Sequence, residues 1–257
     1  ETLFLFGDYP RRTEYLIDIY KRYFEVMAEI GAGVFVLHGA ILSSKVPDER
    51  YMERYLRLFR LAKEFGVTVA QENICYCKSS SVRFIEDMIG QLGDEVRFVV
   101  DLKQARRSNV DPFRLLDIIG DKVVHLHVSD GDAGCDCLPI GKGSFNFNRL
   151  FSELEKINYD KAMIVELYRE NYSSYDELAA CANNMKKIYH RSGITKACLL
   201  TLALSFSAMS CTDLLDKEPP SAISDGSFWT GEGDAMLALT GCCLLYTSPS
   251  PRDAHES

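Results

Sequence analysis

Short apolar runs rich in β-branched residues recur through the first 190 positions of the chain, with amphipathic helical patterns between them. The runs lie near residues 34–38, 67–72, 96–101, 123–128 and 162–167. A helical pattern over 13–30 precedes the first run, and another over 48–65 precedes the second. The first of these patterns has an apolar face formed by Tyr15, Ile19, Tyr23, Val26 and Met27. Strands that alternate with helices in this way predict parallel βα units.

The predicted fold class is α/β, as a partial TIM-type (β/α)8 barrel. A closed barrel of this kind needs eight βα units, and residues 1–189 supply about five of them. We therefore expect three further units upstream in the complete protein. We also expect the five units alone to be catalytically inactive.

Four of the predicted strands end in a residue type that binds metal ions. The runs VTVAQE, RFVVD, VVHLHVSD and AMIVE carry, at their ends, Glu72, Asp101, His127 and Glu166. The carboxyl ends of barrel strands meet at one face, where the active sites of such barrels lie. Three carboxylates and one imidazole make an oxygen-rich site. We therefore predict a divalent metal there, with Mn²⁺, Mg²⁺ or Co²⁺ favoured over Zn²⁺.

Structural alternatives exist for the same carboxylates. A carboxylate at a strand end can cap the helix that follows, or it can pair with Lys103, Arg106 or Arg169. Taken singly, Asp101 and Glu166 fit these roles as well as they fit a metal site. Their recurrence at successive strand ends is what favours the metal site.

Two further histidines lie near these strand ends. His125 is two positions before His127 on the same strand and points to the same side, where an interior hydrogen bond or a substrate contact suits it better than metal ligation. His38 ends the first run, and a substrate contact and a structural role suit it equally.

The composition limits which classes of partner and which cellular compartment we expect for the protein. The net charge of −8 disfavours a nucleic-acid partner, because binding to a phosphate backbone requires clustered Lys and Arg. The nine cysteines lack the spacing of a secreted disulfide scaffold, so free thiols in the cytoplasm are expected for the barrel. The pairs Cys75/Cys77 and Cys135/Cys137 leave a soft-metal or redox site as a minor alternative, since their one-residue spacing is tighter than usual zinc motifs.

Residues 1–189 resemble the xylose isomerase-like TIM-barrel superfamily of sugar phosphate isomerases and epimerases, which includes relatives of endonuclease IV. The resemblance lies in the order of short motifs, namely LHG, QEN, VVD, HLHVSD, LPIGKG and IVE. It implies that one divalent cation is held by Glu72, Asp101, His127 and Glu166. It also implies that Glu72 and Glu166 remove and return a proton at the carbon beside a carbonyl, through an enediolate.

The resemblance further implies a small sugar or sugar phosphate as substrate and a homo-oligomer for the complete protein. Substrate contacts are expected from His38, Asn73, Gln104, His125 and Lys142. Gln104 departs from the family pattern, because many members carry His there. An inositol-type dehydratase or lyase on the same barrel is the alternative. An endonuclease IV-like hydrolase fits less well, because no Asp-x-His follows His127.

The chain changes character beyond about residue 185. Met185-Lys-Lys, the apolar run ACLLTLALSFSAM and Cys211 have the form of a lipoprotein signal peptide, and the run is too short to span a bilayer. The sequence from Cys211 resembles the N-terminus of SusD-like outer-membrane glycan-binding lipoproteins. Residues 243–253 resemble translated sequencing adapter.

These features divide the chain into three parts. We expect a barrel part over 1–189, a lipoprotein signal and SusD-like N-terminal fragment over 190–241, and an artefactual tail over 242–257. The last two are expected to be poorly ordered. The barrel is expected in the cytoplasm and away from membranes, whereas the second part belongs to an exported outer-membrane lipoprotein. A glycan-binding lipoprotein is the alternative function if that second part defines the gene.

Overall fold

The computed structural model describes residues 5–7 and 9–191, and every structural statement below concerns that part of the chain. The described residues all belong to one compact unit. All of the lipoprotein-like segment (190–241) except its first two residues, and the whole adapter-like tail (242–257), lie outside the described residues. Their assignment therefore stays a prediction.

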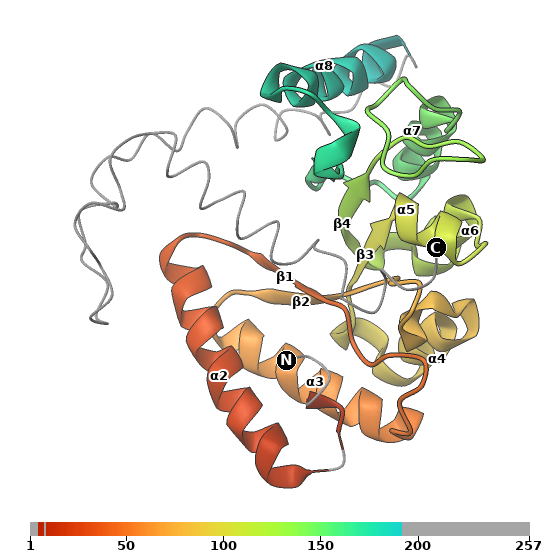
Figure 1. Ribbon diagram of the computed structural model, residues 1–257. Coiled ribbons are helices and arrows are strands. Elements are labelled where there is room, and N and C mark those ends of the chain that lie inside the picture. The colour runs from red at the N-terminus through yellow and green to blue at the C-terminus, as the bar shows by residue number, and fades with distance from the viewer. Residues whose placement is uncertain (1–4, 8, 192–257) are drawn as a thin grey trace. The chain divides into compact units, whose positions relative to one another are not determined.

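Five parallel strands form one sheet in the order β1-β2-β3-β4-β5 (Figure 1). The strands are β1 (Val34–Leu37), β2 (Thr68–Glu72), β3 (Phe98–Asp101), β4 (Val123–Val128) and β5 (Met163–Val165). Each strand pairs in parallel with the next one along the chain. Parallel neighbours require a crossover connection, and helices supply it here. The partial α/β barrel predicted from the sequence is confirmed, and each strand bound lies within two residues of the predicted one.

The connections between strands are helical. The α-helices are α2 (Pro10–Glu29), α3 (Asp48–Glu64), α4 (Val82–Leu92), α5 (Leu102–Arg107), α6 (Pro112–Ile119), α7 (Phe147–Lys156) and α8 (Tyr175–Arg191). Short 3-10 turns lie at η1 (Lys78–Ser80), η2 (Gly93–Glu95), η3 (Gly120–Lys122) and η4 (Arg169–Asn171). Several helices begin at a side chain that accepts a backbone N–H, as Ser81 does for α4 and Asp111 does for α6. One continuous apolar core joins the helices to the sheet.

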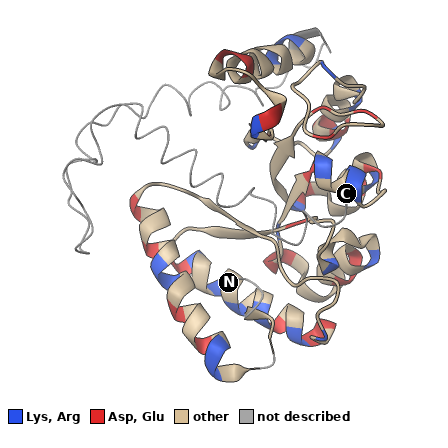
Figure 2. Cartoon of the chain, viewed as in Figure 1, with Lys and Arg blue, Asp and Glu red and all other residues tan. Residues whose placement is uncertain are grey.

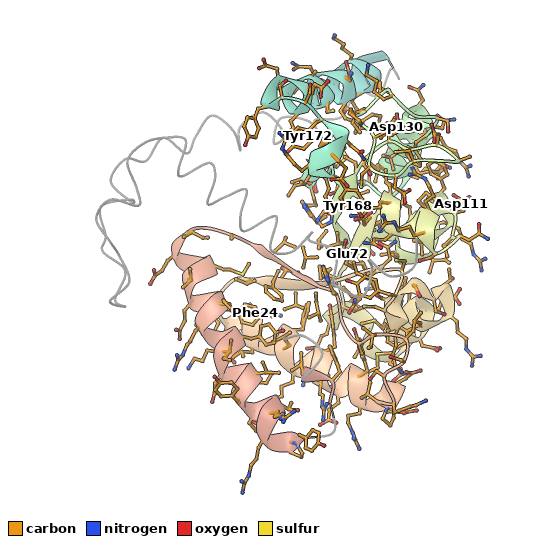
Figure 3. The ribbon with its side chains drawn as sticks, viewed as in Figure 1. Phe24, Glu72, Asp111, Asp130, Tyr168 and Tyr172 are labelled. Carbon is orange, nitrogen blue, oxygen red and sulfur yellow. The ribbon has the colours of Figure 1, made fainter. Side chains whose placement is uncertain are left out.

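The apolar side of α2 in the structure differs from the one that the sequence pattern marked. The residues of α2 that pack inward include Leu16, Ile17, Tyr20 and Phe24, and Phe24 meets Phe35 of β1 edge to face (Figure 3). By contrast Tyr15, Tyr23 and Val26 are exposed. Because α2 has large apolar residues on two sides, the elements that pack against it, α3 and β1, determine which side is buried.

Helix α8 reaches into the stretch that resembles a signal peptide. Its residues Cys181, Met185 and Tyr189 are buried in the same core as the sheet, and Tyr189 packs edge to face on Phe151 of α7. The Met185-Lys-Lys sequence therefore forms the last turns of a barrel helix in this structure. Among the described helices, none is both long and apolar enough to cross a membrane.

Strand β4 contains an irregularity that affects the site. Phe98 pairs with Val123, but the next residue of β3, Val99, pairs with His125, so Val124 is an extra residue in β4. Beyond this point Asp101 lies directly opposite His127. A bulge of this kind re-aims the side chains that follow it.

Candidate metal centre

Four side chains from successive strand ends converge at the carboxyl edge of the sheet. Glu72 and Asp101 are the last residues of β2 and β3, His127 is in β4, and Glu166 follows β5 directly. One ligand atom from each of the four lies within 4.8 Å of all the others. Figure 3 labels Glu72 in this region, below Tyr168. The structure thus brings together the same four residues that the sequence singled out as ligands.

The imidazole of His127 is the centre of the group. Its Nδ1 lies 3.1 Å from Glu72 Oε1 and 3.3 Å from Glu166 Oε2. Asp101 Oδ2 is 3.7 Å from the same nitrogen. One nitrogen can donate a single proton, so three acceptors around it are more than a hydrogen bond can satisfy.

Asp101 has two different roles at its two oxygens. Oδ1 accepts the backbone N–H of Gln104 at 3.0 Å and caps α5, which is the structural alternative considered from the sequence. Oδ2 is fully buried and has no hydrogen-bond partner among the described residues. A buried carboxylate oxygen without a hydrogen bond is costly, and a bound cation is one arrangement that removes this cost.

Burial and mutual contact perturb the protonation of the group. Burial, together with the charge of Glu72, raises the pKa of Asp101 to about 6 despite the nearby imidazole of His127. Burial alone would lower the pKa of His127, but the surrounding carboxylates raise it well above its usual value. The same contacts hold the pKa of Glu72 far below its usual range, even though burial opposes this. Without a metal, a proton on His127 supplies part of the positive charge that the carboxylates require.

Lys103 supplies more of that charge. Its side chain is 5% exposed, and its ammonium lies 2.9 Å from Glu166 Oε1 and 3.6 Å from Asp101 Oδ2. Burial would lower the pKa of Lys103, but these carboxylates raise it above its usual value. In turn, the imidazole of His127 and the ammonium of Lys103 outweigh burial and lower the pKa of Glu166 to about 2.

A hydrogen-bond network beneath the cluster fixes the ends of β1 and β2. The side-chain amide of Gln71 donates to the carbonyls of Leu37, His38 and Glu72, each at 2.9 Å. Its oxygen accepts the hydroxyl of Tyr51, which is fully buried. Neither Gln71 nor Tyr51 was predicted from the sequence to be near the site. A buried Gln inside an apolar strand was the one signal that could have drawn attention to it.

The residues that the sequence predicted to contact the substrate lie at different places relative to the cluster. The Nε2 atom of His38 is 3.2 Å from Glu72 Oε2, so His38 borders the cluster. Asn73 exchanges two hydrogen bonds with the backbone of Asp101, which joins β2 to β3. Gln104 is 7% exposed and accepts the backbone N–H of Cys75.

His125 lies beside His127, with ring centroids 5.2 Å apart and the rings nearly perpendicular. Burial, and then the neighbouring His127, lower the pKa of His125 to about 4, so its imidazole is neutral near pH 7. It is not among the four residues of the cluster.

The loop after β4 is organised by the carboxylate of Asp130, the last residue of the HLHVSD motif. Asp130 is buried and accepts the backbone N–H groups of Gly131, Gly141 and Phe145. The amide of Gly141 is therefore bound inside the protein, and Gly141 has a φ of +89°, a conformation that favours glycine. Lys142 lies exposed on the same loop.

The cysteine pairs do not join the cluster. Cys77 and Cys137 are buried, Cys135 is exposed, and all are free thiols. Burial raises the pKa of Cys77 to about 12 and that of Cys137 to about 11, which opposes thiolate formation. Two surface hollows, of about 420 and 490 Å³, lie alongside α5 and α6 and between α2 and α3, and no cluster residue lines either one.

The donor set fits a divalent cation. It offers carboxylate oxygens and one imidazole nitrogen within a small space, and one buried oxygen has no hydrogen-bond partner among the described residues. Glu72, Asp101, His127 and Glu166 would hold the ion. Carboxylate oxygens and an imidazole nitrogen are ligand types that divalent cations accept.

The fold is that of a partial α/β barrel, with a group of side chains at the carboxyl edge of its sheet that could hold a metal ion. The sequence matches the family described as "Xylose isomerase-like TIM barrel" over residues 4–189. The chain therefore belongs to the xylose isomerase-like TIM barrel family. It is also 30% identical over 179 residues to "Uncharacterized protein MJ1614" of Methanocaldococcus jannaschii, a match that covers 67% of this chain and 68% of that protein.

Solved structures of similar fold include several sugar-modifying enzymes. A D-tagatose 3-epimerase-like protein has a TM-score of 0.62 at 16% identity, with 74% of each chain covered. The IOLI protein "with a binding zinc atom" has a TM-score of 0.61 at 17% identity, covering 74% of this chain and 75% of that one. The 3-keto-D-glucoside 4-epimerase YcjR from E. coli has a TM-score of 0.54 at 16% identity, covering 73% and 75%. At these identities the likeness concerns the fold.

Proposed function

We propose that residues 1–189 form the metal-binding part of a divalent-metal-dependent sugar isomerase or epimerase. The observation that carries the proposal is the convergence of Glu72, Asp101, His127 and Glu166 around a buried carboxylate oxygen that has no hydrogen-bond partner among the described residues. The fold is shared with epimerases whose substrates are sugars, which supports the choice of substrate class.

The chemistry follows from what each group can do. A divalent cation at the cluster would supply a Lewis acid that makes the C–H beside a sugar carbonyl more acidic. A carboxylate must then take the proton and return it. Glu166 is the more accessible carboxylate, at 21% exposure against 3% for Glu72, so Glu166 is better placed to reach a substrate carbon. Glu72 is buried and is held by His38 and His127.

Binding of Mn²⁺ tests the proposal without requiring a complete barrel. Electron paramagnetic resonance would measure free and bound Mn²⁺ for the full chain, for Glu166→Gln and for the control Glu170→Gln. We expect binding by the parent chain and the control, with at least a tenfold weaker affinity for Glu166→Gln. Equal affinities for all three proteins would refute the assignment of the cluster.

The isomerase step needs a separate measurement. The chain, loaded with Mn²⁺, is incubated in D₂O with a panel of ketoses, and deuterium next to the carbonyl is measured by mass spectrometry. Exchange registers every deprotonation, so it detects partial reactions that turnover assays miss. Exchange that depends on Glu166 supports the proposed class, whereas β-elimination products would indicate the dehydratase alternative.

A further inference from the structure

Helix α5 concentrates positive charge next to the acidic cluster. Three of its six residues are Lys103, Arg106 and Arg107, and the helix begins immediately after Asp101. The chain as a whole carries a net charge of −8, so this concentration runs against its overall balance. Figure 2 shows blue ribbon at the place of α5, to the right of the strands.

Two of the three cations of α5 lie close to one aromatic ring. Tyr168 lies two residues beyond Glu166, and the Lys103 ammonium is 5.2 Å from its ring centroid. The Arg107 guanidinium carbon is 5.5 Å from the same centroid. Tyr168 thus lies between Arg107 and the cluster residue Glu166 in a chain of contacts, because Lys103 contacts both Tyr168 and Glu166.

One carboxylate from the loop after β4 is shared between the two arginines. Arg106 Nη1 donates to Asp136 Oδ1 at 2.8 Å, and Arg107 Nε donates to Asp136 Oδ2 at 2.9 Å. Two guanidinium groups thus face a single carboxylate, which leaves one positive charge in excess. The three side chains are 24–37% exposed, so a small molecule can reach them.

The geometry of the two guanidinium groups suits an oxyanion. Each group has five N–H donors, and the described contacts with Asp136 use one nitrogen of each. A planar guanidinium binds phosphate or carboxylate oxygens in a forked manner, which a lysine cannot reproduce. Asp136 occupies part of this site with an oxyanion of the protein itself.

We propose that Arg106 and Arg107, beside Tyr168, bind an oxyanionic group of the substrate, so that the substrate is an acidic or phosphorylated sugar. This inference rests on the proposed function for the position of the sugar carbonyl. The carbonyl end lies at the four-residue cluster, and the oxyanion lies at α5. Neutral ketoses, which carry no oxyanion, are outside this substrate class.

A structural alternative makes the opposite predictions. If the arginines serve only to fasten the loop through Asp136, removal of either partner would loosen the loop and leave oxyanion affinity unchanged. If they bind a substrate oxyanion, Asp136→Asn removes a competing negative charge and strengthens oxyanion binding. Arg107→Met then weakens it. Opposite signs for these two variants distinguish the interpretations.

The test is calorimetric titration of the full chain with inorganic phosphate and, in a second arm, with glycolate, each with and without MnCl₂. We expect phosphate affinity to fall about tenfold or more in Arg107→Met, because a charge-assisted hydrogen bond is lost. Arg107→Lys should recover part of it, and Asp136→Asn should raise it severalfold. Arg114→Met, an exposed arginine of α6, is the matched control and should leave it unchanged.

Several outcomes would overturn the inference. It fails if neither anion binds to the parent chain, or if Arg107→Met binds both anions as tightly as the control does.

The relative affinities of the two anions identify the substrate. Tighter binding of glycolate than phosphate indicates a sugar acid, and the reverse order indicates a sugar phosphate. Mn²⁺ affinity is measured in every variant and should not change in Arg107→Met. If the parent chain binds phosphate but does not bind Mn²⁺, the proposed function is refuted and the oxyanion site is still supported.

Discussion

Substitution of Asp101 should separate the stability of the fold from its capacity to bind metal. The Asp101 carboxyl is buried, and its pKa is raised from 3.8 to about 6. The folded chain therefore holds this proton to a higher pH than the unfolded chain does. The contribution of Asp101 to stability is fully present below pH 4 and is lost as the pH rises through about 6.

The magnitude follows from the size of this change. At 1.36 kcal/mol per pH unit, the ionised carboxylate destabilises the metal-free fold by roughly 3 kcal/mol at pH 7.5. Asp101→Asn is always neutral, and Asn can keep the cap on α5 because its oxygen can still accept the N–H of Gln104. We expect Asp101→Asn to raise the free energy of unfolding by up to about 3 kcal/mol at pH 7.5 and by about half of that at pH 5.

The assay is urea unfolding of the EDTA-treated chain at both pH values, with Mn²⁺ affinity measured alongside. The loss of a direct ligand should weaken Mn²⁺ binding by at least about 100-fold, because loss of an outer partner already costs 10- to 100-fold. Asp117→Asn, on the exposed side of α6, serves as control and should change stability by less than about 0.5 kcal/mol. A destabilised Asp101→Asn protein, or a gain that does not shrink at pH 5, would refute the reasoning.

Other predictions concern the metal and the backbone. Mn²⁺ at 100 times its dissociation constant should stabilise the chain by about 2.7 kcal/mol in thermal or urea unfolding, whereas no shift would mean that the folded state has no site. Mn²⁺ affinity should fall as the pH drops below about 6, the value to which the pKa of Asp101 is raised, because protons compete for the ligands; a flat profile from pH 5 to 8 would contradict this. Gly39→Ala should destabilise the fold by more than about 2 kcal/mol, because Gly39 has a φ of +85° and its added Cβ would lie 2.1 Å from the Tyr51 hydroxyl. Gly90→Ala, within α4 and with no atom near the added Cβ, should instead stabilise it by about 0.5–1 kcal/mol, and the opposite sign in urea unfolding would count against the α4 assignment.

The strands and the four cluster residues were predictable because each is marked locally. An apolar run that ends in a carboxylate or a histidine can be recognised within six residues, and parallel pairing brings successive strand ends together. Asp101 and Glu166 also show why such a pattern is incomplete. Asp101 caps a helix while it joins the cluster, and Glu166 pairs with Lys103 while it does so.

The features that could not be predicted depend on contacts between residues that are far apart in the sequence. Gln71 joins two strand ends through contacts that no local pattern encodes, since its partners come from β1 and α3. Asn73 was expected at the substrate, and the structure places its side chain against the backbone of Asp101. The buried face of α2 was equally undetermined, because Tyr15 and Tyr23 are as apolar in pattern as the residues that pack inward.

The extra residue in β4 sets a limit on how this chain can vary. Without Val124 as an unpaired position, uniform pairing from Phe98 and Val123 onward would set Leu126 opposite Asp101. A shift of one residue turns every side chain of a strand to the other face. Insertions in the connections between strands would leave the four ligands where they are. A single insertion between Val123 and His127, with the one-residue bulge kept, would set Leu126 opposite Asp101 and put an aliphatic group in place of the imidazole. The length of this strand segment is therefore as much a requirement of the candidate metal centre as the identity of its histidine.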